Sequence, residues 1–233
     1  MYSPVGETVE FRSNGFMASG YLASPAMGSG PGVIVIQEWW GLNAQIKGVA
    51  DRLAEAGFTA LAPDIYRGEL AGHDEMDKAG HLMQTLPPER AAKDMSGAID
   101  FLASHTAVNG DGLGVIGFCM GGMLAFLLAA QRPDKVAAAV PFYGFPQGDA
   151  EPDWTELAAV VRGHMASPDD FFAPEAAKAL EARLRNLGKD VTITIHPAGH
   201  AFMNEENPGG MYDAELAARL WPEVTAFLHD ELG

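Results

Sequence analysis

The chain has a single cysteine and few basic side chains. One thiol cannot form an internal disulfide, so a reducing cytoplasm is the expected location. The 233 residues include 15 Lys and Arg against 31 Asp and Glu, which gives a formal net charge of -16. Nucleic acids and anionic membranes bind surfaces rich in Lys and Arg, so we expect neither as a partner.

Two kinds of segment are also missing from the sequence. No uncharged apolar run is long enough to span a membrane, and residues 1–7 contain neither the basic nor the apolar part of a signal peptide. No repeat, low-complexity stretch or change in composition divides the chain. Because 48% of the residues are hydrophobic, the chain can bury a large core. We expect one domain over residues 1–233, and a monomer.

The hydrophobic pattern alternates between strands and helices along most of the chain. Residues 5–11 and 16–23 predict an antiparallel hairpin, and the β-branched run 33–36 predicts a strand buried on both faces. Further strands are expected at 58–62, 112–116, 136–142, 157–162 and 191–196, and helices at 46–56, 89–104, 123–130, 175–187 and 214–232. This alternation predicts an α/β fold with a mostly parallel central sheet and helices on both faces. Residues 66–88 are polar and irregular, which indicates an excursion or lid.

The one cysteine, Cys119, lies in the glycine-rich segment 117–122 (GFCMGG), between a predicted strand and a predicted helix. This pattern matches the G-x-nucleophile-x-G elbow of hydrolases, with Cys in place of the usual Ser. The glycines are needed because the turn is strained and side chains there would collide with neighbouring backbone. The helix N-terminus favours a thiolate and supplies an N–H donor for a developing oxyanion.

A catalytic thiol needs a base, and the base needs an orienting carboxylate. His200 is the expected base because it follows the last predicted strand in a loop, whereas His196 lies within that strand and His229 on the final helix. The acid is expected in the loop after the preceding strand. Asp169 and Asp170 are adjacent there, and their spacing alone does not separate them.

A second carboxylate, Glu38, lies in the loop after the predicted strand 33–36. Its negative charge would oppose ionisation of Cys119, or the carboxylate would accept the thiol proton. The same loop is expected to donate an oxyanion N–H, from Trp39. Trp39 and Trp40 either line a pocket or cover the core, and the scattered methionines are interpreted as core filler.

Two motif matches are rejected. Residues 112–117 fit the dinucleotide fingerprint G-x-G-x-x-G, but they contain a strand instead of following one. His196 and His200 are four residues apart, but Pro197 and Gly199 exclude the helix that would direct both at one metal. We therefore expect neither a nicotinamide cofactor nor a metal.

The ordered motifs resemble those of the dienelactone hydrolase family (carboxymethylenebutenolidases) over nearly the whole chain. They are 37–43 (QEWWGLN), 62–66 (APDIY), 117–122 (GFCMGG), 142–144 (FYG), the Asp170 segment and 199–202 (GHAF). The resemblance implies an α/β-hydrolase fold. It also implies cleavage of a small ester or lactone through a thiol acyl-enzyme, without a cofactor.

By this resemblance Cys119 is the nucleophile and His200 the base. The family's acid stands four residues before a proline, as Asp170 stands before Pro174, so Asp170 is implied as the orienting acid. Glu38 matches a carboxylate that takes the thiol proton when substrate arrives.

The resemblance also implies an oxyanion hole made by the backbone N–H groups of Trp39 and Met120. Further substrate contacts are expected from Trp40, Tyr143 and Phe202.

Family members that act on dienelactone hold its carboxylate with two arginines. The matching regions of this chain, residues 203–206 and 73–78, contain no arginine. Arg67 or Lys78 would have to substitute, although neither matches the motif. The residues expected for acyl transfer therefore match the family more fully than the residues that would bind dienelactone.

Two other functions use the same fold. A thiol sensor or binding protein could keep the elbow without hydrolysing an ester. An acyltransferase would form the same acyl-enzyme and pass the acyl group to an acceptor other than water.

Overall fold

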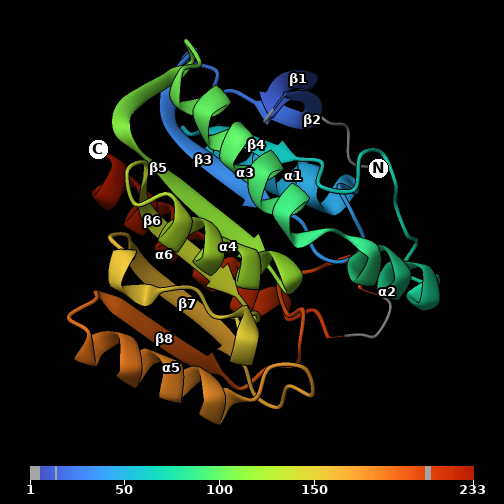
Figure 1. Cartoon of the computed structure of the whole chain (residues 1–233), viewed down its shortest axis with the longest axis vertical. Helices are drawn as coiled ribbons and strands as arrows, with labels where there is room; N and C mark the ends of the chain where they lie inside the picture. Colours follow the sequence, from blue (N-terminus) through green and yellow to red (C-terminus); the bar gives the residue numbers. More distant parts are fainter. Residues whose placement is uncertain (1–5, 14, 208–210) are drawn as a thin grey trace.

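A single sheet of eight strands lies at the centre of the part of the chain that the structure describes, residues 6–13, 15–207 and 211–233 (Figure 1). The structure is a computed structural model. The strands are β1 (Glu7–Ser13), β2 (Phe16–Ala23), β3 (Gly30–Ile36), β4 (Thr59–Pro63), β5 (Val108–Phe118), β6 (Val136–Phe142), β7 (Val160–Ala166) and β8 (Val191–His196). Their order across the sheet is β1-β2-β4-β3-β5-β6-β7-β8.

Pairing is parallel from β4 through β3 to β8 and antiparallel only at the N-terminal edge. β1 pairs with β2 in the register Ser13 to Phe16, and β2 pairs antiparallel with β4. The sequence prediction of a mostly parallel sheet with an N-terminal hairpin is therefore confirmed. Asn14, placed in the turn of that hairpin, lies outside the described residues. The strand expected at 157–162 runs from Val160 to Ala166, because a short 3-10 turn occupies residues 154–156.

Six α-helices accompany the strands in the described residues. They are α1 (Ala44–Glu55), α2 (Met76–Thr85), α3 (Pro88–Ala103), α4 (Met120–Gln131), α5 (Pro174–Asn186) and α6 (Ala214–Leu232). Five were predicted from the sequence; α2 was not, since residues 66–88 were interpreted as irregular. Among the helices described, none is both long and apolar enough to cross a bilayer.

The alternating side chains of β3 divide the core into two layers. Ile34 and Ile36 face the cluster formed with α3, α4 and α5, whereas Val33 and Val35 face the cluster formed with α1 and α6. All four side chains are fully buried, as expected for a strand covered on both faces. Helices therefore cover both faces of the sheet, as the sequence predicts.

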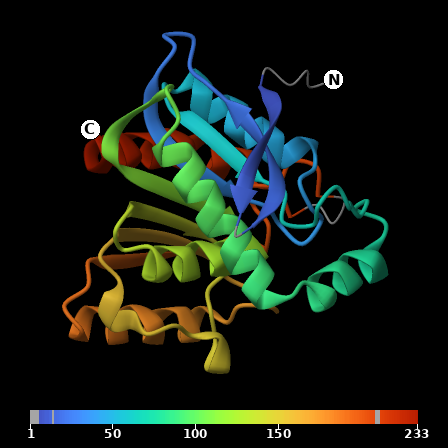
Figure 2. The ribbon, with the colours of Figure 1, turned by 45° about the horizontal axis from the view of Figure 1, so that its top comes forward.

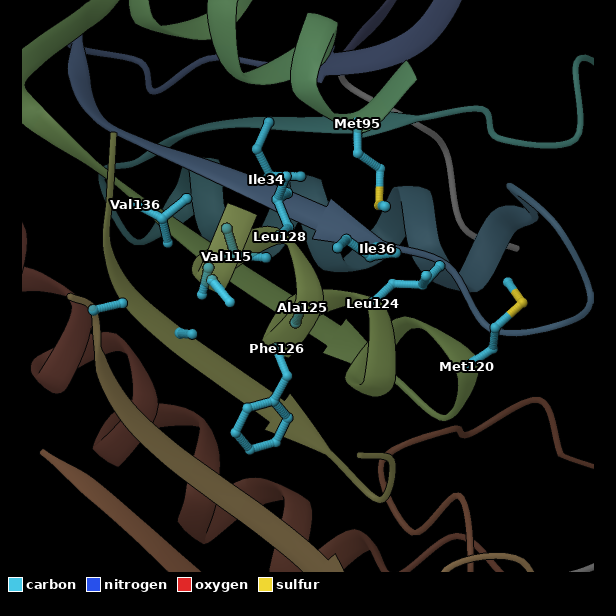
Figure 3. Packing of buried hydrophobic residues seen from close by; sticks show 14 of the residues in the cluster. Ile34, Ile36, Met95, Val115, Met120, Leu124, Ala125, Phe126, Leu128 and Val136 are labelled. Carbon is cyan, nitrogen blue, oxygen red and sulfur yellow. The ribbon is translucent and has the colours of Figure 1, made fainter. Parts of the chain in front are cut away.

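Helix α4 is apolar on nearly all sides and packs into the first of these layers. Figure 3 shows Leu124 and Leu128 among Ile34, Ile36 and Val115 of the neighbouring strands. A helix that is hydrophobic all round is held in place by its burial. This burial fixes the N-terminus of α4, and with it the turn that joins β5 to α4.

Helix α2 lies beyond one end of α3 (Figures 1 and 2) and contributes only two side chains to the first core layer. Only Ala79 and Leu82 of this helix are buried, while Met76 and Met83 are 51% and 40% exposed. Residues 76 and 83 are two turns apart and lie on one face of the helix. The excursion predicted at 66–88 is present, but it contains a helix with two methionines on one face.

Candidate active site

The candidate site residues lie in loops at one edge of the sheet. Glu38 follows β3, Cys119 follows β5, Asp169 follows β7 and His200 follows β8. Because the carboxyl ends of parallel strands meet at the same edge, these four side chains from distant parts of the sequence converge there. Ligands bind at this edge in open α/β sheets.

Cys119 has the strained backbone expected of a nucleophile elbow. Its φ of 54° and ψ of -116° are rare for a residue with a side chain. The Cys119 N–H donates to the Phe142 carbonyl at 3.0 Å, and the Cys119 carbonyl accepts from the Gly122 N–H at 2.9 Å. A Cβ at Gly117 would overlap the backbone oxygen of Gly121. Close backbone packing therefore holds the strained turn and accounts for its glycines.

His200 is oriented by Asp169. His200 Nδ1 lies 2.8 Å from Asp169 Oδ2. The other Asp169 oxygen accepts the backbone N–H groups of Phe171, at 2.8 Å, and Phe172, at 3.1 Å. The Asp169 side chain is fully buried and fixed by these contacts. Because an ionised carboxylate only accepts hydrogen bonds, Nδ1 carries the imidazole proton and Nε2 is left as the basic nitrogen.

The expectation that Asp170 orients the histidine is wrong in its geometry. Asp170 is exposed, whereas the side chain of Asp169 turns inward to His200. Two neighbours in an irregular loop point in different directions. The spacing to Pro174 gave no information on which of the two points inward.

Aromatic rings surround His200 on several sides. The Phe171 ring lies 4.9 Å away, the Tyr143 ring 5.1 Å and the Phe172 ring 6.0 Å, measured between ring centroids. These rings leave the imidazole only 11% exposed. Packing of this kind limits rotation of the imidazole about the Asp169 hydrogen bond.

Glu38 is a buried carboxylate held by two neutral donors. The Tyr143 hydroxyl donates to Glu38 Oε1 at 3.0 Å, and Asn204 Nδ2 donates to Glu38 Oε2 at 2.6 Å. Burial raises the pKa of Glu38, and these two hydrogen bonds oppose the rise only in part. Sequence reasoning missed Asn204, although it lies two residues beyond the 199–202 motif.

Burial raises the pKa of the Cys119 thiol, and the nearby Glu38 carboxylate raises it further. A hydrogen bond from the Met120 backbone N–H acts in the opposite direction and is outweighed. From the sequence, the helix N-terminus was expected to favour the thiolate and Glu38 to oppose it. Burial and Glu38 together outweigh the helix N-terminus and favour the protonated thiol.

Cys119 opens into a cavity of about 750 Å³ that is lined mostly by apolar side chains. Trp39 and Met120, the two expected oxyanion donors, lie in its wall, and Met120 is the first residue of α4. The first N–H groups of a helix have no partner within the helix, so the Met120 position suits an oxyanion donor. The lining residues are Glu38, Trp39, Trp40, His73, Met76, Met83, Cys119, Met120, Met123, Gln147, Phe171, Phe172, His200, Ala201, Asn207 and Met211.

Of the four expected substrate contacts, only Trp40 lines this cavity. Tyr143 and Phe202 are fully buried and pack against each other, with their ring centroids 5.1 Å apart. Arg67 points to the buried Asp94 instead, with Nη2 3.2 Å from Oδ2. None of these three side chains lines the cavity, because a position in the sequence does not show which way a loop side chain faces.

The interpretation of the scattered methionines as core filler also needs correction. Met76, Met83, Met120, Met123 and Met211 all line it, so these five are not simply core filler. They come from α2, from α4 and from the segment before α6. No signal in the sequence connects elements so far apart.

The histidines that were not expected to act as the base have structural contacts. His196 Nε2 lies 3.1 Å from His164 Nδ1, on a different element from the His200–Asp169 pair. His229 Nε2 lies 2.9 Å from the Ala56 carbonyl oxygen. Within the described residues, no group of three or more His, Cys, Asp or Glu side chains could hold a metal ion.

The sequence and the fold are similar to those of known proteins along almost their whole length. The family model of the Dienelactone hydrolase family matches residues 18–232. "Protein usf" of Aquifex pyrophilus is 37% identical, with 98% of this chain and all of that protein covered. A "Putative carboxymethylenebutenolidase" of Aquifex aeolicus is 34% identical, with 96% of this chain and 97% of that protein covered.

A solved structure supports the same relationship. The crystal structure named "Putative Dienelactone Hydrolase" from Klebsiella pneumoniae superposes with a TM-score of 0.83 at 27% identity, covering 98% of this chain and 99% of that one. The expected α/β-hydrolase fold is therefore confirmed. With a family model that spans all but the ends of the sequence, the chain belongs to the dienelactone hydrolase family and is a hydrolase of esters or lactones.

Proposed function

We propose that Cys119 is the nucleophile of this hydrolase and that the reaction passes through a thiol acyl-enzyme. His200 acts as the general base and acid, and Asp169 orients it. The observation that carries the proposal is the convergence at one cavity of a strained elbow cysteine and a histidine whose Nδ1 is fixed by a buried carboxylate. A nucleophile, a base and an orienting group are the parts that covalent acyl transfer requires.

Acylation begins with the protonated thiol. Glu38 was expected from the resemblance to take the thiol proton, but both of its oxygens already accept hydrogen bonds, from Tyr143 and Asn204. His200 Nε2 therefore takes the proton of Cys119, and Sγ attacks the carbonyl carbon of the ester. The backbone N–H groups of Trp39 and Met120 stabilise the oxyanion that forms. When the tetrahedral intermediate collapses, the C–O bond to the leaving group breaks and His200 returns the proton to the departing alkoxide. The product of this half-reaction is a thioester on Cys119.

Deacylation uses the same groups with water. His200 Nε2 takes a proton from water, and the hydroxide attacks the thioester carbonyl. The C–S bond breaks, the carboxylic acid leaves, and the proton returns to the sulfur. The Cys119 thiol is then protonated again, and the nearby Glu38 carboxylate favours this protonated form. Thiolate attack suits esters and lactones better than amides, because the thiolate leaves more readily than an amine does.

Intact-mass spectrometry after exposure to a library of lactones and 4-nitrophenyl esters tests this proposal. The wild-type protein should gain the mass of one acyl group. Cys119→Ala should gain none and should lose more than about 10³-fold in kcat. Thermal unfolding of both proteins provides the control for folding. Hydrolysis by Cys119→Ala at the wild-type rate would contradict the proposal.

The same experiment separates the alternatives. Alkylation of Cys119 by iodoacetamide, with no acyl adduct and no turnover across the library, would indicate a thiol sensor or binding protein. Transfer of the acyl group to added alcohols or thiols in preference to water would indicate an acyltransferase.

A further inference from the structure

We propose that the cavity selects neutral, apolar esters or lactones and discriminates against substrates that carry a carboxylate. The inference rests on the proposed function and specifies its substrate class. The cavity provides about 750 Å³, which is in the range of sites for drug-sized ligands and far more than an acetyl group needs.

The described cavity wall offers no Lys or Arg side chain to an anionic substrate. None of its described lining residues is Lys or Arg, and the segments outside the description, residues 1–5, 14 and 208–210, contain neither. Arg67 is engaged by Asp94 at 3.2 Å, and Lys78 lies 3.8 Å from Glu75. A substrate carboxylate entering this cavity would lose its hydration without gaining an ionic partner, which is strongly unfavourable.

The one acidic group in the wall strengthens this discrimination. Glu38 is 2% exposed, and both of its oxygens already accept hydrogen bonds, from Tyr143 and Asn204. Both donors are uncharged, so neither would give a substrate carboxylate an ionic partner. Since Tyr143 and Asn204 already donate to Glu38, they leave no donor for a substrate carboxylate at this point of the apolar wall.

The rest of the wall is adaptable and apolar. Five methionines from three parts of the chain line it, together with aromatic rings. Methionine is unbranched and polarizable, and methionine-rich surfaces accept apolar groups of varied shape. This composition fits an extended alkyl or aromatic group beside the reacting carbonyl.

His73 supplies a polar contact on the side of the cavity formed by segment 66–88. Its ring packs edge-on against Trp40, with centroids 4.8 Å apart. Its Nε2 is buried and has no hydrogen-bond partner among the described residues. A buried imidazole nitrogen without a partner can bind an uncharged carbonyl, ether or hydroxyl oxygen of the substrate.

A matched pair of substrates tests the inference. 4-Nitrophenyl hexanoate and 4-nitrophenyl hydrogen adipate share the leaving group and the six-carbon acyl chain, and only the second ends in a carboxylate. The methyl ester of the second restores neutrality at the same length. We expect kcat/KM for both neutral esters to exceed that of the acid by about 10²-fold at pH 7.5. Equal values for all three would overturn the inference.

A variant pair tests its physical cause. Met83→Arg places a cation in the cavity wall, at a side chain exposed enough to tolerate it, and should raise kcat/KM for the acid relative to hexanoate at least about tenfold. Met27→Arg is the control, because Met27 is 92% exposed and does not line the cavity. An unchanged ratio in Met83→Arg would count against the inference.

A binding measurement separates failure of the inference from failure of the proposed function. Quenching of tryptophan fluorescence in Cys119→Ala, which keeps Trp39 and Trp40 in the cavity wall, reports ligand occupancy without turnover. Methyl hexanoate should bind and hexanoate should not. If both bind equally, the inference fails even where hydrolysis proceeds through Cys119. If only the neutral ligand binds but no acyl-enzyme forms, the proposed function fails and the selectivity stands.

Discussion

At the scale of single residues, the geometry distinguishes side chains that the sequence presents as equivalent. Asp169 and Asp170 are neighbours of the same chemistry, yet only Asp169 is fully buried against His200. Glu38 was identified from its position after a strand, whereas its donor Asn204 comes from a loop 166 residues away. The direction of a side chain in a loop depends on contacts of the whole fold, which a local pattern does not contain.

Substituting each aspartate in turn tests the role of Asp169. Asp169→Asn should lower kcat by about 10²–10⁴-fold, because the amide would no longer hold the His200 tautomer that leaves Nε2 basic. Asp170→Asn is the matched control and should leave kcat within about twofold, since this side chain is exposed. Steady-state hydrolysis of one 4-nitrophenyl ester is sufficient for the comparison. Equal losses in the two variants would refute the assignment.

Glu38 should set the pH at which the Cys119 thiol ionises. Burial and the Glu38 charge both raise the pKa of Cys119, and Glu38→Gln removes the charge while it keeps the burial. Removal of a neighbouring negative charge favours the thiolate, so the pKa should fall. The rate of iodoacetamide alkylation, measured against pH, should then rise at lower pH than in the wild type.

Glu55→Gln provides the charge-matched control for this titration, because Glu55 is an exposed residue at the end of α1. Its alkylation profile should overlay that of the wild type. A Glu38→Gln profile that stays unchanged, or moves to higher pH, would show that burial alone sets the thiol pKa.

At the scale of elements, hydrophobic periodicity predicts the strands and helices that are strongly buried in the core. It misses helix α2, which is weakly buried. The run 33–36 and the helical pattern of 214–232 are both confirmed, because two-sided burial imposes a strong pattern on a sequence. Helix α2 buries only Ala79 and Leu82 and contains Gly80, so its pattern is weak. Because most side chains of α2 are not packed in the core, Met76 and Met83 are free to line the cavity.

Replacement of glycine by alanine should have opposite effects on stability at two positions, 117 and 80. Gly117→Ala should destabilise the fold by about 3 kcal/mol or more, because the new Cβ would overlap the Gly121 backbone oxygen in a packed turn. Gly80→Ala has open space around it within α2 and should be neutral, or stabilising by up to about 1 kcal/mol. Chemical denaturation of the two variants measures both effects. Similar stabilities would contradict the close packing of the elbow.

At the scale of the whole molecule, the net charge of -16 acts on any ionic substrate before it reaches the cavity. Long-range repulsion slows the approach of anions and is screened by salt. For 4-nitrophenyl hydrogen adipate, kcat/KM should rise about two- to fivefold between about 0.01 M and 0.15 M NaCl, as the Debye length falls from about 30 Å to about 8 Å. The hexanoate ester is the internal control and should not respond. A salt response shared by both substrates would point to a change in the protein instead.

The placement of segment 66–88 has a consequence for how this protein can change. His73, Met76 and Met83 reach the cavity from this one segment, which contributes no member of the proposed nucleophile, base and acid. It departs from the end of β4 and returns at α3, and it contributes Tyr66, Ala71, Ala79 and Leu82 to the first core layer. An exchange for the corresponding segment of a relative that keeps these four packed residues should leave the proposed nucleophile, base and acid in place and change which molecules enter the cavity. Changes confined to this one segment can therefore alter which substrates the protein accepts, while the proposed catalytic residues stay the same.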